Sequence, residues 1–289
     1  MNFGSISTAM VTPFDSKGNI DFGRTTKLVN HLINNGTDSL VVAGTTGESA
    51  TLTTEEKIAL FKHVVKVVDG RVPVIAGTGS NNTKASIDLS KKAEEIGVDA
   101  IMIVAPYYNK PSQEGIIAHY KAIASAVSLP IMAYNIPGRS VITFSVDTVL
   151  RLAEVPNIVA LKDAGGNLDT MSEVIENTPD DFVVYCGDDG LTLPSLAVGS
   201  AGIVSVASHV IGNEMQTMIK AFRDGENKEA GRIHRKLLPV MQELFKAPSP
   251  APVKTALQVR GLDVGGVRLP LLPLNQSERE ALSIRLNSL

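Results

Sequence analysis

Eight short apolar runs recur along this chain with amphipathic stretches between them, and this recurrence limits the folds open to it. The runs are rich in Val and Ile and do not alternate with polar residues, a pattern typical of parallel strands buried on both faces. They follow one another at a spacing of roughly 30 residues, the length of one βα unit. The runs cover residues 6–11, 39–43, 72–76, 100–105, 130–134, 157–162, 182–186 and 202–206. Eight such units predict a closed (β/α)8 TIM barrel rather than an open doubly wound sheet.

Helix signals occupy the stretches between the runs. Thr53 is followed by two glutamates at the start of an apolar-periodic segment, which predicts an N-cap with acidic residues in the first turn. Ser112 and Ser145 begin similar segments.

The pattern changes after residue 206, where helical segments continue without a further strand. Helices are expected over residues 213–223, 226–245, 254–260 and 277–286. We therefore predict a (β/α)8 barrel over residues 1–224 and a C-terminal helical extension over residues 225–289, with no linker between them.

Composition excludes several classes of function. The chain has 289 residues, of which 44% are hydrophobic and 20% charged, as expected of a globular protein with a large core. Its net charge of −3 disfavours a sequence-independent binder of nucleic acid or anionic membranes. The N-terminus lacks signal-peptide features and no apolar stretch reaches the ~18 residues of a membrane span, so a cytoplasmic protein is expected.

Cysteine and histidine usage offers no metal site. The single cysteine, Cys186, cannot form an intrachain disulfide, which fits a reducing compartment, and we expect it to be a buried strand residue. The five histidines are scattered, without metal-ligand spacing. The glycines around Thr78 lack the Gly-x-Gly-x-x-Gly spacing, so a dinucleotide is not expected either. No metal or cofactor is predicted.

Lys162 is the strongest chemical signal. It ends the sixth apolar run and is followed by Asp163 and a Gly-rich turn. A lysine is rarely buried unless it is paired or functional, and an amine removed from water is more often neutral and nucleophilic. Such an amine can attack a ketone and form a Schiff base. The run alone also permits Lys162 to lie past the strand, in solvent or paired with Asp163.

Polar residues collect where the other runs end, which in a barrel is the active-site face. Tyr134 ends the fifth run and can move protons as an imine forms and breaks, although a core tyrosine would fit the same pattern. Thr45 follows the second run and can relay a proton through its hydroxyl. Arg139 suits a substrate carboxylate but would also fit a surface ion pair.

Two further groups at these ends have open interpretations. Gly77 and Gly79 either form only a tight turn or let backbone approach a ligand closely. Asp188 and Asp189 resemble a metal pair, but a capping or turn role is favoured.

Taken together and in order, these motifs resemble the dihydrodipicolinate synthase family, within the wider pyruvate-dependent lyases that include N-acetylneuraminate lyase. The resemblance runs essentially end to end. The matching motifs are Val11-Thr12-Pro13-Phe14, Gly44-Thr45-Thr46-Gly47-Glu48, Gly77-Thr78-Gly79, Pro106-Tyr107-Tyr108-Asn109, Tyr134-Asn135-Ile136-Pro137-Gly138-Arg139, Lys162-Asp163, Gly187-Asp188-Asp189 and Pro252-Val253-Lys254.

The resemblance implies a barrel enzyme that condenses pyruvate with aspartate 4-semialdehyde, giving 4-hydroxy-tetrahydrodipicolinate in the diaminopimelate route to lysine. Lys162 matches the Schiff-base lysine, Tyr134 the proton donor and acceptor, and Thr45 and Tyr108 the proton relay. The tyrosine pair lies at a subunit interface in the family, so Tyr107 should contact a neighbouring chain of a homo-oligomer, expected to be a tetramer.

The resemblance also implies substrate contacts. Thr46 and Val204 match pyruvate contacts, and Gly187 belongs to the same substrate-binding set. Arg139 matches the residue that holds the carboxylate of the aldehyde substrate. Val204 stands where some members have Ile, and Ser140 stands where many have Thr.

Two rival functions remain at this point. The first is an aldolase or lyase acting on sialic acid or a 2-keto-3-deoxy sugar acid, which Thr45-Thr46 and Arg139 disfavour. The second is a non-catalytic barrel that senses a keto acid, which only the intact set of Lys162, Tyr134 and Thr45 disfavours.

The resemblance further bears on feedback by lysine. Relatives that are inhibited by lysine bind it near four residues that this chain also has, namely Ser49, Ala50, Asn81 and Tyr107. Positions where those relatives carry histidines or a glutamate differ, namely Thr54, Lys57 and Ala85. We therefore expect an enzyme that is insensitive to lysine.

Overall fold

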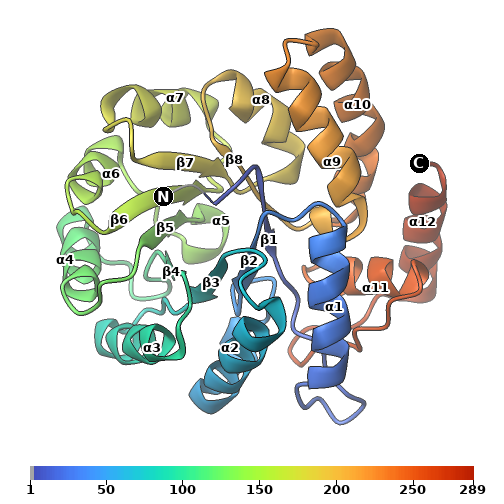
Figure 1. Cartoon of the computed structure of the whole chain (residues 1–289), viewed down its shortest axis with the longest axis horizontal. Helices are drawn as coiled ribbons and strands as arrows, with labels where there is room; N and C mark the ends of the chain where they lie inside the picture. Colours follow the sequence, from blue (N-terminus) through green and yellow to red (C-terminus); the bar gives the residue numbers. More distant parts are fainter. Residues whose placement is uncertain (1–2) are drawn as a thin grey trace.

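The computed structural model describes residues 3–289 and contains a closed barrel of eight parallel strands in the order β1-β2-β3-β4-β5-β6-β7-β8 (Figure 1). Each strand falls within one residue of a predicted apolar run, so the predicted (β/α)8 TIM barrel is confirmed. The strands are β1 (Ile6–Ala9), β2 (Ser39–Val42), β3 (Val74–Gly77), β4 (Ala100–Val104), β5 (Ile131–Asn135), β6 (Ile158–Asp163), β7 (Val183–Cys186) and β8 (Gly202–Ser205).

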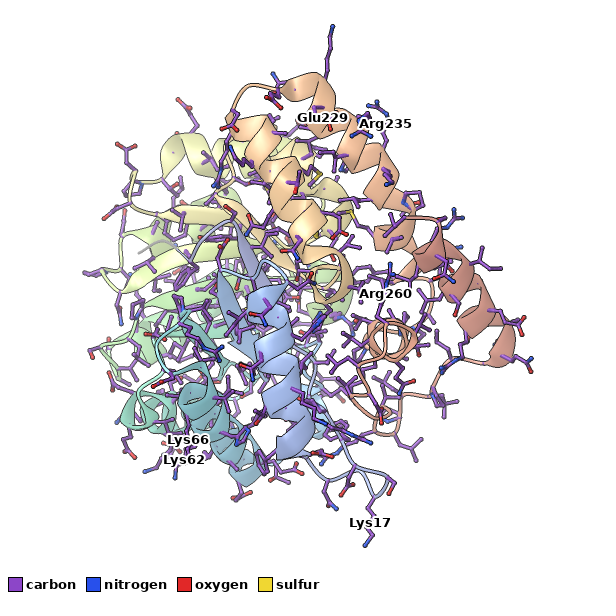
Figure 2. All side chains as sticks on the ribbon, turned by 45° about the vertical axis from the view of Figure 1, so that its right-hand side comes forward. Lys17, Lys62, Lys66, Glu229, Arg235 and Arg260 are labelled. Carbon is purple, nitrogen blue, oxygen red and sulfur yellow. The ribbon has the colours of Figure 1, made fainter. Side chains whose placement is uncertain are left out.

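Helices surround the barrel and continue beyond it. The α-helices are α1 (Phe22–Asn34), α2 (Thr54–Val68), α3 (Thr83–Ile96), α4 (Gln113–Ala124), α5 (Pro137–Ser140), α6 (Val146–Ala153), α7 (Leu168–Asn177), α8 (Thr192–Ala197), α9 (Ser208–Arg223), α10 (Asn227–Glu243), α11 (Ala251–Val259) and α12 (Gln276–Asn287). Two short 3₁₀ helices, η1 (Ser49–Thr51) and η2 (Asp189–Leu191), lie in the loops after β2 and β7. Charged side chains such as Lys62 and Lys66 of α2 project outward (Figure 2).

The predicted helix starts are confirmed. Thr53 caps α2 and forms a reciprocal capping box with Glu56, while Ser112 and Ser145 cap α4 and α6. Helix α9 begins at Ser208, five residues before the predicted start, and its backbone leaves helical geometry at Ile211.

Two apolar layers make up the barrel. The outer layer packs the strands against the surrounding helices, and Cys186 belongs to it as a buried strand residue, as predicted. The inner layer fills the barrel with alternate strand residues, among them Ala160 of β6, Tyr134 of β5 and Val204 of β8. Because side chains alternate along a strand, a residue two positions after Ala160 also points inward.

The C-terminal helices pack on one side of the barrel. Helices α10 to α12 lie beside α9 and α1 in Figure 1, and an ion pair joins Arg24 of α1 to Asp263 after α11 at 2.6 Å. Arg260, labelled in Figure 2, donates to the Leu286 carbonyl of α12 at 2.9 Å. The predicted boundary after residue 224 falls between α9 and α10, and the division into two parts stays a prediction. Within residues 3–289, no helix is long and apolar enough to span a bilayer.

Candidate active site

Lys162 and Tyr134 lie side by side at the carboxyl ends of their strands. They are register partners on β6 and β5. Lys162 follows Ala160 by two positions and therefore points into the barrel, where only 5% of its surface is exposed. Its Nζ lies 4.1 Å from the centre of the Tyr134 ring. This burial removes the alternative that Lys162 points into solvent.

The next register pair, Asn135 and Asp163, ties the same two strand ends together. Asn135 Nδ2 donates to Asp163 Oδ1 at 2.8 Å, and the Gly165 amide donates to the same oxygen at 3.1 Å. Burial raises the pKa of the Asp163 carboxyl, while these hydrogen bonds oppose the rise. One oxygen of the carboxyl is thus occupied by Asn135 and Gly165, and within residues 3–289 no ion pair joins Asp163 to Lys162. Sequence reasoning considered Asp163 only as a possible partner of Lys162 and assigned Asn135 no role, although each directly follows a predicted strand-end residue.

Thr45 and Thr46 lie in a tight turn after β2. The Glu48 amide donates to the Thr45 carbonyl at 3.0 Å, and Thr12 Oγ1 donates to the Gly47 carbonyl at 2.6 Å. Thr46 is buried, whereas Thr45 is partly exposed at the barrel mouth.

Gly77 and Gly79 allow the neighbouring backbones to approach this turn. A Cβ on Gly77 would lie 2.5 Å from the Ala43 carbonyl oxygen, and one on Gly79 would lie 2.4 Å from the Val104 amide nitrogen. Close backbone packing therefore accounts for both glycines. Both also line a small cavity that contains Thr45 and Tyr134.

A larger pocket, which we call the outer pocket, extends from Thr45 toward the surface of the chain. Its volume is ≈ 200 Å³, and Thr45, Lys57, Tyr107 and Arg139 are among its lining residues. Thr45 also lines the small cavity with Tyr134, so it connects the two spaces. Arg139 is exposed on α5 and forms no ion pair with any residue in 3–289, so its guanidinium is free to bind an anion.

The remaining predicted residues are distributed around this mouth. Val204 is buried in the same inner layer as Tyr134. Gly187 lines a neighbouring pocket of ≈ 390 Å³, and a Cβ there would lie 2.7 Å from Cβ of Ala164. Tyr108 is 87% exposed and has a left-handed backbone with φ 73°, so its ring projects from the surface of the chain.

The two aspartates after β7 hold backbone. Asp188 accepts from the Gly190 amide at 2.9 Å as the N-cap of η2. Asp189 is buried and accepts from the amides of Val206 and Ala207 at 3.1 and 2.8 Å. Burial raises the pKa of the Asp189 carboxyl. The predicted capping role is confirmed for Asp188, whereas Asp189 instead binds the backbone that follows β8.

Known proteins resemble this chain over essentially its whole length. The sequence profile described as the Dihydrodipicolinate synthetase family matches residues 2–289. The chain is 66% identical over 283 residues to a 4-hydroxy-tetrahydrodipicolinate synthase of Bacillus velezensis, a match that covers 98% of each chain. A crystal structure of the dihydrodipicolinate synthase DapA-2 from Bacillus anthracis is 68% identical, with a TM-score of 0.99 over 100% of this chain and 99% of that one. A lysine-bound enzyme from Cyanidioschyzon merolae is 48% identical, with a TM-score of 0.97 over 99% and 98% of the two chains.

Proposed function

The chain belongs to the dihydrodipicolinate synthetase family and has 4-hydroxy-tetrahydrodipicolinate synthase activity, that of a lyase, and we propose that Lys162 carries this activity as a Schiff base with pyruvate. The observation that carries the proposal is the position of the Lys162 amine, inside the barrel and 4.1 Å from the Tyr134 ring centre. The activity places the chain in the diaminopimelate route of lysine biosynthesis.

The proposed chemistry begins with attack of Lys162 Nζ on C2 of pyruvate. The carbinolamine loses its hydroxyl as water to form the imine, and loss of a proton from C3 gives an enamine. The enamine carbon then bonds to the aldehyde carbon of aspartate 4-semialdehyde. Attack of the substrate's own amine on C2 closes the ring and releases the lysine amine.

Proton transfers in these steps fall to Tyr134 and Thr45. Tyr134 lies against the reacting amine, and Thr45 lines the same cavity as Tyr134. A hydroxyl both donates and accepts, so Thr45 can pass protons between Tyr134 and the outer pocket. We assign Tyr108 the outer end of this relay.

Substrate recognition uses residues at the barrel mouth. We assign pyruvate contacts to Thr46, Gly187 and Val204. Arg139 lines the outer pocket next to Thr45 with its guanidinium free, which suits the carboxylate of the semialdehyde.

The relay requires a second copy of the chain under this proposal. Tyr108 projects from the surface, and the adjacent Tyr107 is also exposed. A neighbouring chain in a cytoplasmic homotetramer would bring its Tyr108 to the outer pocket, where Tyr107 lies at the contact.

A coupled assay separates the candidate functions. Product formation from pyruvate and aspartate 4-semialdehyde, with no cleavage of N-acetylneuraminate, is expected. The reverse pattern would identify the sugar-acid lyase. A keto-acid sensor would bind pyruvate without becoming reduced onto it when borohydride is added.

A further inference from the structure

The turn that carries Thr45 and Thr46 lies between two strained residues. Ala43 before the turn has φ 53°, and Glu48 after it has φ 58° and ψ 36°. Both are non-glycine residues in the left-handed region, where a Cβ is disfavoured. Such conformations persist only where the surrounding structure fixes them.

The C-terminal helices supply what fixes Glu48. Lys254 of α11 donates from Nζ to Glu48 Oε1 at 2.6 Å, and the side chains of this ion pair are only 2% and 1% exposed. The second carboxylate oxygen of Glu48 accepts from the Arg268 amide at 2.9 Å. Lys254 also donates to the Gly266 carbonyl at 2.7 Å. Each polar atom of the pair thus has a partner, as a buried charge requires.

Arg268 extends the contact over the rest of the β2–α2 connection. Its guanidinium donates to the Thr51 carbonyl at 2.7 Å and to Glu56 Oε2 at 2.9 Å. The cations of Arg268 and Lys254 lie 4.4 and 4.2 Å from the centre of the Phe14 ring, which adds a cation–π contact to each. The residues Glu48, Thr51 and Glu56 are therefore each bound by the C-terminal extension, through Lys254 of α11 and through Arg268 in the connection between α11 and α12.

From these contacts we infer that Lys254 and Arg268 are positioning residues, which hold the Thr45 turn in its catalytic conformation. Lys254 acts through Glu48, whereas Arg268 acts through Glu48 with its backbone amide and through Thr51 and Glu56 with its guanidinium. We call Glu48, Lys254 and Arg268 the turn clamp. The inference rests on the proposed function because it acts through the proton relay of Thr45. Misplacing a relay hydroxyl by about 1 Å can lower the rate by about 100-fold.

The test removes the buried charges together. A single substitution would leave one buried charge unpaired, which is strongly destabilising. The double variant Glu48→Gln/Lys254→Met keeps the side-chain volumes and removes both charges. The matched control is Glu243→Gln/Lys246→Met, which removes a 2.7 Å pair of the same extension that contacts none of the turn residues named above.

Three readouts are compared after circular dichroism has established that each variant is folded: kcat, KM for pyruvate, and borohydride capture of pyruvate on Lys162. The clamp variant is expected to lose about 10- to 100-fold in kcat, with pyruvate capture retained and KM for pyruvate within about threefold. The control should match the unmodified enzyme. A folded clamp variant with unchanged kcat would overturn the inference.

A cycle with Thr45→Val distinguishes positioning from a general loss. If the clamp acts through Thr45, adding its substitutions to Thr45→Val should lower kcat no further, whereas losses that multiply would contradict the inference. Should the double variant not fold, Arg268→Met tests the same clamp from its partly exposed side, and an unchanged kcat there would also overturn it. Failure of the unmodified enzyme to capture pyruvate would instead refute the proposed function.

Discussion

Lys162 and Tyr134 are register partners on adjacent strands, and the Lys162 Nζ lies 4.1 Å from the centre of the Tyr134 ring. The amine is thus presented beside a phenol ring in a nearly closed space. A small planar keto acid has to enter this space to react.

The first prediction concerns Lys162. Borohydride reduction with pyruvate should add one reduced pyruvate to the peptide that contains Lys162. Lys162→Ala should abolish this addition and lower kcat on the order of 10³-fold or more, because the covalent route is lost. Mass spectrometry and steady-state kinetics check both results. Lys66→Ala, on the outer face of α2, serves as the control, and label on any other lysine would refute the assignment.

The second prediction concerns Arg139. Arg139→Ala should lower kcat/KM for aspartate 4-semialdehyde by about 10- to 150-fold, since a hydrogen bond to a charged group contributes about 1.5–3 kcal/mol. Capture of pyruvate by borohydride should stay unchanged. Arg151→Ala, which removes an exposed pair with Glu114 on α4, is the control. An equal loss in both steps would make Arg139 structural.

The third prediction concerns assembly. Tyr108→Phe should lower kcat without altering the oligomer, because the phenol hydroxyl supplies the outer end of the proposed relay. Dilution below the association range should produce inactive monomers. Analytical ultracentrifugation with parallel assays measures both. A fully active monomer would rule out a contribution from a second chain.

The fourth prediction concerns lysine. The outer pocket is lined by Ser49, Ala50 and Tyr107, and also by Lys57. The ammonium group of Lys57 would repel the two ammonium groups of a bound lysine. A glutamate partner is absent from position 85, which is Ala. Because about 1.4 kcal/mol changes affinity tenfold, these differences should leave the activity unaffected by millimolar L-lysine. Titration calorimetry and assays decide the matter, and clear inhibition below 1 mM (roughly −4 kcal/mol of binding) would contradict it.

The fifth prediction concerns acid stability and His209. Its Nε2 accepts from the Val11 amide at 3.1 Å and its Nδ1 lies 2.8 Å from the Val206 carbonyl, so the ring is held neutral. Burial lowers the pKa of His209 to about 4 from an ordinary value of 6.5. The unfolded chain therefore takes up the proton first, and stability present above pH 6.5 is lost as the pH falls toward 4, by up to about 3 kcal/mol.

Thermal unfolding between pH 7 and pH 4 measures this loss. His209→Gln should flatten the dependence. Burial also lowers the pKa of His119 to about 4, so His119→Gln/His209→Gln should flatten it further. An unaltered slope in the double variant would refute the role of these rings.

The fold was predictable because its signals are local. Each strand is a short apolar run, and the starts of α2, α4 and α6 are set by capping residues within one turn. The predicted start of α9 was wrong because no capping residue marks the true start. Ala207 occupies the N-cap position without a side-chain hydrogen bond, and the backbone is irregular at Ile211.

The site was predictable only in part. Lys162 and Tyr134 can be recognised in the sequence because each ends an apolar run. The Glu48–Lys254 ion pair cannot be recognised in this way, because no local sequence pattern marks a buried charge and the two residues are 206 positions apart along the chain. The clamp could be recognised only once tertiary contacts were known.

The residues that hold Glu48 are translated long after Glu48 itself. The last strand of the barrel ends at Ser205, but Lys254 and Arg268 are synthesised later, at about 5–20 residues per second. A nascent chain can therefore close its barrel several seconds before the turn with Thr45 receives its fastening. The Thr45 turn can therefore be held in place only when translation is nearly complete. A chain terminated before Lys254 would contain the whole barrel sequence but lack the contacts that hold this turn.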